Sequence, residues 1–169
     1  MSDSAARWVD ALADRPIPAL KANLKHCREL VDLPDTSHSE LGDIINRDPG
    51  LASLFFRHIN KTRVQKSRPL ISTITSSLNL MGSGAIRNLL DQATSLEDEV
   101  QDQAVVSQWY ALILRSYHAA RLAELWSDSL GDRAPSEVYI ATFLMNLGDF
   151  CIATTDPIRC KSLYQARLA

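Results

Sequence analysis

The stretch that decides the fold is SHSELGDIINRDPGLASLFFRHIN, residues 37–60. Ser37 and Glu40 have the spacing of a capping box, in which two side chains satisfy backbone N–H groups at the start of a helix. Asp48-Pro49 is a second start signal, because Asp caps free N–H groups and Pro fits the first helical position, where no N–H is needed. Two short helices in close succession predict a fold in which helix packs on helix.

Apolar residues recur at spacings of three and four on both sides of this stretch, and the alternation typical of strands is scarce. Pro16, the Gly82-Ser83-Gly84 turn and Gly131 mark breaks between helices. The expected helices cover approximately residues 8–15, 20–33, 37–45, 49–59, 74–81, 86–93, 98–127, 136–148 and 156–168. The sequence therefore predicts one all-α domain over residues 1–169, a compact bundle of about eight to nine helices.

The composition excludes several classes of protein. With 18 Lys and Arg against 20 Asp and Glu, the formal net charge of -2 is too balanced for a chain that binds nucleic acid over its whole surface. The three cysteines, Cys27, Cys151 and Cys160, are odd in number and lack the spacing of a zinc site or a disulfide framework. Because there is no signal peptide and no run of about 18 uncharged apolar residues, we expect a cytoplasmic protein without a membrane span.

Several short motifs occur in the order found in HDOD domains. They are Leu33-Pro34, Asp48-Pro49-Gly50-Leu51, His58-Ile59-Asn60, Ile74, Leu80-Met81-Gly82, Trp109, Ser116, Ala119-Ala120 and Leu144-Met145-Asn146-Leu147-Gly148-Asp149. The chain thus resembles the HDOD family over residues 33–149. The resemblance implies an HD-like helical domain used in bacterial signalling, commonly without catalysis of its own, with other signalling proteins or domains as its partners.

HDOD domains are relatives of HD phosphohydrolases, which hold a divalent metal through a His, a consecutive His-Asp pair and a further Asp. The resemblance places His118 at the first His, but Met145-Asn146 replaces the His-Asp pair. A thioether is a poor donor to an oxygen-preferring cation, and Asn cancels no charge. Asp149 shares a helix face with Asn146 but leaves the ligand set incomplete. We therefore predict no metal, no cofactor and no enzymatic activity, and we expect His118 to be a partly buried, hydrogen-bonded residue.

Five cations lie within twelve residues without an intervening acid. They are Arg57, Lys61, Arg63, Lys66 and Arg68. We expect a basic loop over residues 61–68, which either is simply solvated or binds an anionic ligand or an acidic partner surface. The stretch lacks the interleaved aromatic residues that stack on bases, which argues against nucleic acid as the partner.

The sequence favours a non-catalytic regulatory module that works by protein–protein interaction. One alternative is a sensor that keeps a nucleotide or cyclic dinucleotide in a degenerate HD pocket around His118, Met145 and Asn146. A metal-dependent phosphohydrolase is the disfavoured alternative. The chain ends soon after Asp149, whereas HDOD domains usually continue through further helices, so we expect either a fragment of a longer protein or a shortened member of the family. If residues are missing, the apolar surface that they leave uncovered is expected to pair two copies in a homodimer.

Overall fold

The computed structural model describes residues 15–33, 36–156 and 162 of the chain, and the expected helices at residues 8–15 and 156–168 lie essentially outside this part. Within it the chain is helical, and one isolated parallel bridge joins Ala19 to Ser95. The elements are α2 (Lys21–Val31), α3 (His38–Ile45), α4 (Pro49–Gln65), α5 (Ile74–Asn79), α6 (Ser83–Asp91), α7 (Leu96–Glu99), α8 (Gln103–Ser129), α9 (Pro135–Phe143), the 3-10 helix η1 (Leu144–Asn146) and α10 (Leu147–Thr155). The predicted all-α class is confirmed.

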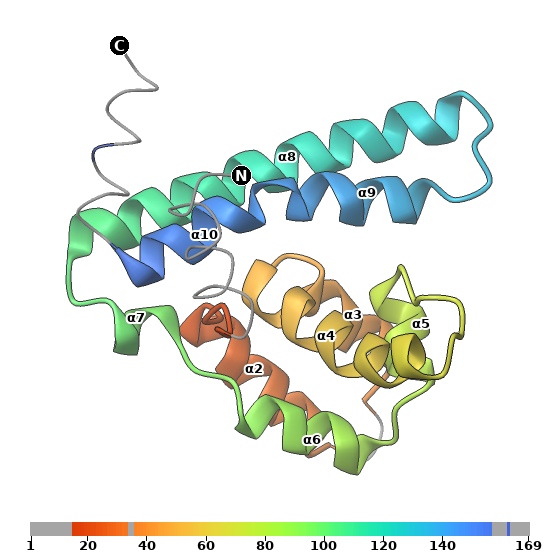
Figure 1. The fold of residues 1–169 in the computed structure, drawn as a ribbon, viewed down its shortest axis with the longest axis horizontal. Helices are drawn as coiled ribbons and strands as arrows, with labels where there is room; N and C mark the ends of the chain where they lie inside the picture. Colours follow the sequence, from red (N-terminus) through yellow and green to blue (C-terminus); the bar gives the residue numbers. More distant parts are fainter. Residues whose placement is uncertain (1–14, 34–35, 157–161, 163–169) are drawn as a thin grey trace.

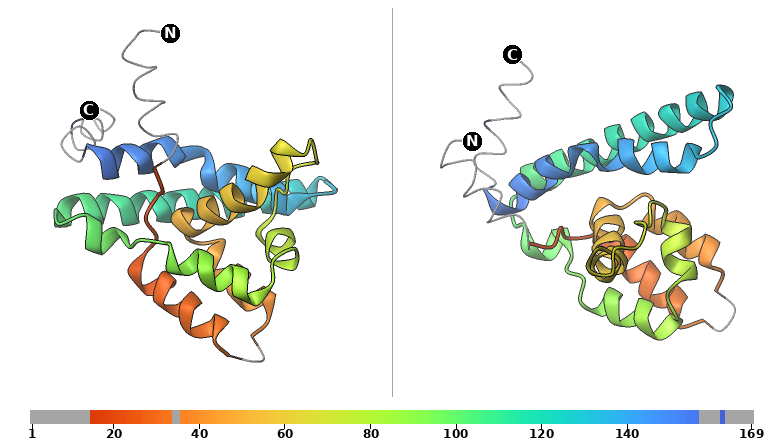
Figure 2. Two further views of the ribbon diagram at one scale, coloured as in Figure 1. Left: turned by 60° about the horizontal axis from the view of Figure 1, so that its bottom comes forward. Right: turned by 45° about the vertical axis from the view of Figure 1, so that its right-hand side comes forward.

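The helices form two layers (Figure 1). Helices α2 to α6 make an N-terminal bundle, and α8 runs antiparallel to the α9–η1–α10 stretch as a long hairpin that lies across this bundle. Figure 2 shows the same two layers from two further sides, with α7 leading from the bundle into the hairpin. Residues distant in sequence therefore meet where the hairpin lies across the bundle.

Two apolar cores hold the layers together. The first combines the bundle with the far half of the hairpin, and its largest buried side chains include Leu41, Phe55, Leu78, Leu90 and Phe143. The second lies between α7, α8 and α10, where the rings of Trp109 and Phe150 are tilted with centroids 5.1 Å apart. Backbone bonds from Ala19 N–H to the Thr94 carbonyl at 2.9 Å and from Leu96 N–H to the Ala19 carbonyl at 2.8 Å tie the N-terminal segment to α7.

The predicted helix starts are confirmed. The Ser37 hydroxyl accepts the Glu40 N–H at 3.1 Å, and the Asp48 carboxylate accepts the Leu51 N–H at 3.1 Å. Thr73 and Asp102 cap α5 and α8 in the same way, by accepting N–H groups of Ser76 and Ala104. The starts at Ser37 and Asp48 were visible in the sequence because each depends on a few neighbouring residues.

The expected basic loop is wrong, because α4 continues to Gln65 and carries Lys61 and Arg63 on helix. No Gly or Pro interrupts residues 51–65, so the helix runs on until Ser67 takes a positive φ of 50°. Asn60, where we expected the helix to end, instead receives the returning chain. Its amide donates to the Ile71 carbonyl at 2.9 Å and accepts the Ile71 N–H at 2.8 Å.

Two other boundaries also differ from expectation. The long helix begins at Gln103 and not near residue 98, because α7 is a separate turn whose Leu96 is fully buried. The segment expected at residues 136–148 is divided, since α9 ends at Phe143 and η1 turns the chain into α10. Tyr139, Ile140 and Phe143 form the buried face of α9.

The stretch Pro135–Thr155 is long and apolar enough to cross a membrane by length and composition, with a mean hydropathy of 1.3 over its most apolar window. It packs onto α8, and Phe143 and Phe150 are fully buried in the two cores. The core helix of a globular domain passes the same test. The expectation of a chain without a membrane span stays a prediction.

Candidate functional site

Two of the four residues at the HD positions, His118 and Met145, lie at the surface. His118 is exposed on α8, and Met145 is 73% exposed in η1. Asn146 uses its amide to donate to the buried Ser116 hydroxyl at 2.9 Å, and Asp149 lies in the first turn of α10. The expectation of a partly buried His118 is wrong, because the side chain is exposed on α8, where its ring lies edge-on to that of Tyr117 with centroids 5.7 Å apart.

The five cations of the basic cluster are spread around the end of α4. Arg57 and Lys61 lie four residues apart on one side, whereas Arg63 is rotated about 200° from Lys61 around the helix axis. Arg57 donates to the Arg15 carbonyl at 3.1 Å, and Arg63 donates to the Pro69 carbonyl at 2.6 Å. Lys66 and Arg68 are exposed beyond the helix. The structure therefore does not gather the five charges on one surface.

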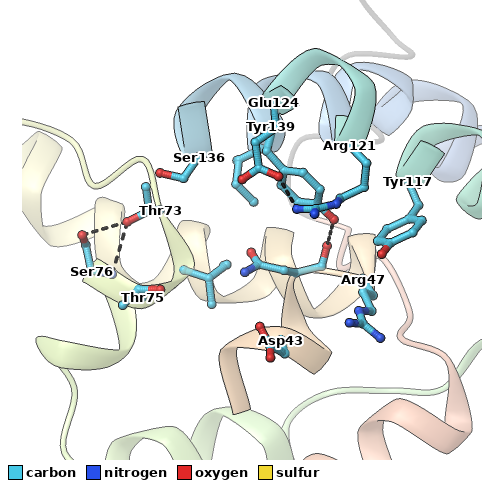
Figure 3. A pocket seen from close by; sticks show the side chains of 13 residues that line it. Asp43, Arg47, Thr73, Thr75, Ser76, Tyr117, Arg121, Glu124, Ser136 and Tyr139 are labelled. Atoms are coloured by element: carbon cyan, nitrogen blue, oxygen red, sulfur yellow. Dashed lines mark hydrogen bonds and ion pairs between the residues drawn. The ribbon is translucent and has the colours of Figure 1, made fainter. Parts of the chain in front are cut away.

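A polar groove of about 580 Å³ opens between the bundle and the hairpin (Figure 3). Its walls come from α3, from the start of α5, from α8 and from the start of α9. The polar and charged lining residues are Asp43, Asn46, Arg47, Thr73, Thr75, Ser76, Tyr117, Arg121, Glu124, Ser136 and Tyr139. None of the four HD positions belongs to the lining.

The contacts inside the polar groove leave one cation uncommitted. Arg121 forms an ion pair with Glu124 of its own helix, and the Tyr139 hydroxyl donates to the Asn46 carbonyl at 2.9 Å, which joins the two layers. Burial raises the pKa of Tyr139 above its ordinary range, which keeps the hydroxyl a donor. The guanidinium of Arg47 lies 5.9 Å from the centre of the Tyr117 ring and makes no ion pair with the residues that the structure describes.

Sequence reasoning missed the polar groove. Its lining residues come from four elements between Asp43 and Ile140, and they meet only because the hairpin lies across the bundle. The single local signal was Arg47, directly before the Asp48 cap, and one exposed Arg beside a helix start is too common to indicate a site.

A row of exposed apolar side chains follows the outer face of α8. We call it the α8 stripe and define it as Ala111, Leu114, His118, Leu122 and Leu125. Leu114, Leu122 and Leu125 are 57%, 62% and 56% exposed, although each is the type of residue that usually lies inside a protein. The core-facing side of the same helix, with Trp109, Ser116 and Ala120, is buried. Helix α8 is therefore apolar on two opposite sides.

Comparison with known proteins decides the family. The HDOD domain family matches residues 17–168 of the chain. The chain belongs to the HDOD family. No curated protein matches it.

Two solved structures with this HDOD fold are crystal structures of the MmoQ response regulator from Methylococcus capsulatus strain Bath. One is 24% identical with a TM-score of 0.68, and the similarity covers 83% of this chain and 56% of MmoQ. The other, of MmoQ fragment 20–298, is 19% identical with a TM-score of 0.66, covering 84% of this chain and 54% of that fragment. The HDOD chain thus spans little more than half the length of these MmoQ chains.

The divalent metal of HD enzymes does not fit the residues of this HDOD domain. Met145 turns its thioether to the surface, and the Asn146 amide is engaged by Ser116. Among the described residues, no group of three or more His, Cys, Asp or Glu side chains comes together to hold a metal. Octahedral or tetrahedral coordination needs several such donors around one point, so we derive no metal-dependent step for this chain.

Proposed function

We propose that this HDOD chain is a regulatory module that acts by binding protein and does not turn over a substrate. The observation that carries the proposal is the α8 stripe, where three leucines more than half exposed share one helix face. Contiguous exposed apolar surface of this kind typically marks a protein interaction site, because leaving it in water costs free energy that a partner recovers.

Two further observations support a regulatory role. The family is one whose members commonly signal without catalysis, and MmoQ is described as a response regulator. At the positions where an HD enzyme binds its metal, this chain has Met145 and Asn146, which are unsuitable ligands. The exposed apolar surface supports binding, and the replacement of the metal ligands argues against catalysis, so both observations favour a binding module.

A photo-crosslinking amino acid at Leu122, introduced in living cells, tests the proposal. We expect a discrete protein adduct at Leu122 and none at Leu80, which is 56% exposed on α5's C-terminal side and serves as the matched control. The purified chain is assayed in parallel against phosphate esters with Mg²⁺, Mn²⁺ and Fe²⁺. Hydrolysis that is lost in Asp149→Asn would show an enzyme and overturn the proposal.

A second candidate function, ligand sensing, is favoured by the polar groove. Arg47 lines this groove beside the Tyr117 ring and has no ion pair among the described residues. A guanidinium beside a tyrosine ring is a typical site for a phosphate attached to a ring system, such as a nucleotide. This groove replaces the degenerate HD pocket as the place where we propose that such a ligand binds.

Thermal melts with nucleotides and cyclic dinucleotides test the sensor. A ligand present at 100 times its dissociation constant adds about 2.7 kcal/mol of stability to the wild type. We expect Arg47→Ala to abolish the shift and Lys66→Ala, in the scattered basic cluster, to preserve it. No shift in the wild type at millimolar ligand, or a shift that survives Arg47→Ala, would remove the sensor function from this groove.

A further inference from the structure

We propose that the α8 stripe is the interface of a homodimer in which two α8 helices run antiparallel and cross at His118. The inference rests on the proposed function, since it names a second copy of the chain as the protein that covers the stripe. Two features carry it: the spacing of the exposed residues along α8 and the symmetry of that spacing about one position.

The spacing is that of a helix–helix seam. Residues 111, 114, 118, 122 and 125 follow one another at intervals of three, four, four and three. At 100° per residue they fall within a strip about 80° wide and about 21 Å long. Intervals that alternate between three and four keep an apolar strip facing a second helix, as in coiled coils. Figure 1 shows α8 along one edge of the molecule, and the three leucines of the α8 stripe are each more than half exposed.

The stripe is also symmetric about His118. Leu114 and Leu122 lie four residues to either side of it, and Ala111 and Leu125 lie seven residues to either side. A two-fold axis through His118, perpendicular to the helix, therefore sets Leu114 opposite Leu122 of the second copy and Ala111 opposite Leu125. An isologous interface requires a patch that complements itself in this way. A helix of another protein would bind equally well to a stripe without this symmetry.

The charges beside the stripe are compatible with the pairing. Arg115 and Arg121 lie three residues to either side of His118, so an antiparallel pair brings them to the same height along the axis. They flank the stripe on opposite sides, about 60° from its centre, and the two-fold axis therefore keeps them apart across the interface. Arg121 is in addition paired with Glu124 of its own helix. The interface thus buries apolar residues and leaves the cations at its rim.

Disulfide crosslinking tests the symmetry directly. In a Cys151→Ser, Cys160→Ser background, where Cys27 remains buried, His118→Cys places one thiol on the two-fold axis. Mild oxidation should convert most of this variant to a covalent dimer. Ser107→Cys is the matched control, because Ser107 is exposed on the same face but its two copies are about 33 Å apart in the antiparallel pair. Equal crosslinking at both positions would overturn the proposed register.

A mixture of two variants tests the same register independently. Leu114→Cys and Leu122→Cys, each alone, separate their own thiols by about 12 Å along the axis, beyond the reach of a disulfide. When the two variants are mixed, the proposed pairing brings the different thiols together. We expect disulfide formation to be much faster in the mixture than in either variant alone. Self-crosslinking as fast as mixed crosslinking would contradict the antiparallel pairing.

Sedimentation of the full chain tests the dimer itself. We expect the wild type to associate reversibly, and Leu122→Asp to raise the dissociation constant at least about 100-fold, because it sets carboxylates against the apolar face of the other copy. Leu80→Asp, the same change at an equally exposed leucine outside the stripe, should leave association unchanged. Circular dichroism confirms that both variants are folded. A wild type that stays monomeric, or a dimer that Leu122→Asp does not weaken, overturns the inference.

The outcomes separate this inference from the proposed function. A monomeric wild type whose Leu122 still crosslinks to a different protein in cells would remove the homodimer and leave the regulatory module in place. A dimer that hydrolyses phosphate esters would leave the proposed homodimer interface in place and would contradict the proposed non-catalytic function.

Discussion

At the scale of single residues, Asp48 does more than the helix cap that its sequence context predicts. The carboxylate is fully buried and accepts three donors, the N–H of Leu51 at 3.1 Å, the N–H of Leu20 at 2.8 Å and the side-chain amide of Asn23 at 3.1 Å. Burial outweighs these hydrogen bonds and raises the pKa of Asp48 from 3.8 to about 6. Asp48 therefore joins α2 to α4. The free energy that burial of its carboxylate costs depends on pH.

The pH dependence of Asp48 has a definite sign. Because the folded carboxyl has the higher pKa, the folded chain holds more protons than the unfolded chain between about pH 4 and pH 6, and stability falls as pH rises through this window. Asp48→Asn removes the titration. The free energy of unfolding of the wild type, minus that of the variant, should therefore decrease by up to about 1.4 kcal/mol per pH unit. Urea unfolding at pH 4, 5, 6 and 7 measures it, and a difference that rises with pH would contradict the prediction.

Gly50, two residues after Asp48, is required by the close approach of another segment. A Cβ at this position would lie 2.3 Å from the Pro18 carbonyl oxygen and 2.8 Å from the Ala19 nitrogen, both backbone atoms that cannot turn aside. Gly50→Ala should lower the free energy of unfolding by about 2–3 kcal/mol. Gly84→Ala, in α6 with no atom within 4 Å, should instead raise it by about 0.5–1 kcal/mol by restricting the unfolded chain. Chemical denaturation of both variants checks the pair, and equal effects would refute the steric explanation.

At the scale of elements, α8 shows how a single helix serves two purposes. Trp109 is buried against Phe150 in the second core, whereas Trp126 on the same helix is 75% exposed. Both lie on the long helix that the sequence predicts, but helical spacing alone does not tell which of two apolar sides faces the core. The contacts of α9 and α10 decided it.

The two tryptophans provide a matched comparison. Trp109→Ala should cost about 3–5 kcal/mol of stability, since it opens a cavity beside Phe150. Trp126→Ala should change stability by less than about 0.5 kcal/mol when measured at low protein concentration. Urea titrations followed by far-ultraviolet circular dichroism give both values. A comparable loss in the two variants would mean that Trp126 packs against something within the same molecule.

At the scale of the whole molecule, the two layers share one core. Phe143 of the hairpin is buried with Leu41 and Phe55 of the bundle. Polar contacts reinforce the junction, because Tyr139 donates to the Asn46 carbonyl and Ser72 donates to Glu137 at 2.6 Å. Neither layer can therefore open without exposing apolar surface of the other.

We accordingly expect the bundle and the hairpin to unfold together. Tryptophan fluorescence of a Trp8→Phe, Trp126→Phe variant, which follows Trp109 in the hairpin, and far-ultraviolet circular dichroism, which follows all helices, should give coincident urea transitions. The calorimetric and van't Hoff enthalpies should also agree. Two separate transitions, with the fluorescence change preceding or following the loss of helix, would show that the layers are independent.

Helix starts and the helical class could be predicted from the sequence because they depend on contacts between near neighbours. The Ser37 and Asp48 caps are each made within three residues. The spacing of apolar side chains is likewise a property of a single helical segment. The replacement of a His-Asp pair by Met145-Asn146 could also be recognised from the sequence, because the ability to bind a metal depends on the side chains themselves.

Tertiary structure alone decided where helices end, which residues line the polar groove and which side of α8 faces outward. Asn60, where the helix was expected to end, instead binds the returning chain at Ile71, and α7 is separate from α8 with its Leu96 buried in the second core. Arg47, Arg121 and Ser136 meet only when the hairpin lies across the bundle. All of these features depend on contacts between residues distant in sequence. A local sequence pattern does not reveal the free energy of such contacts.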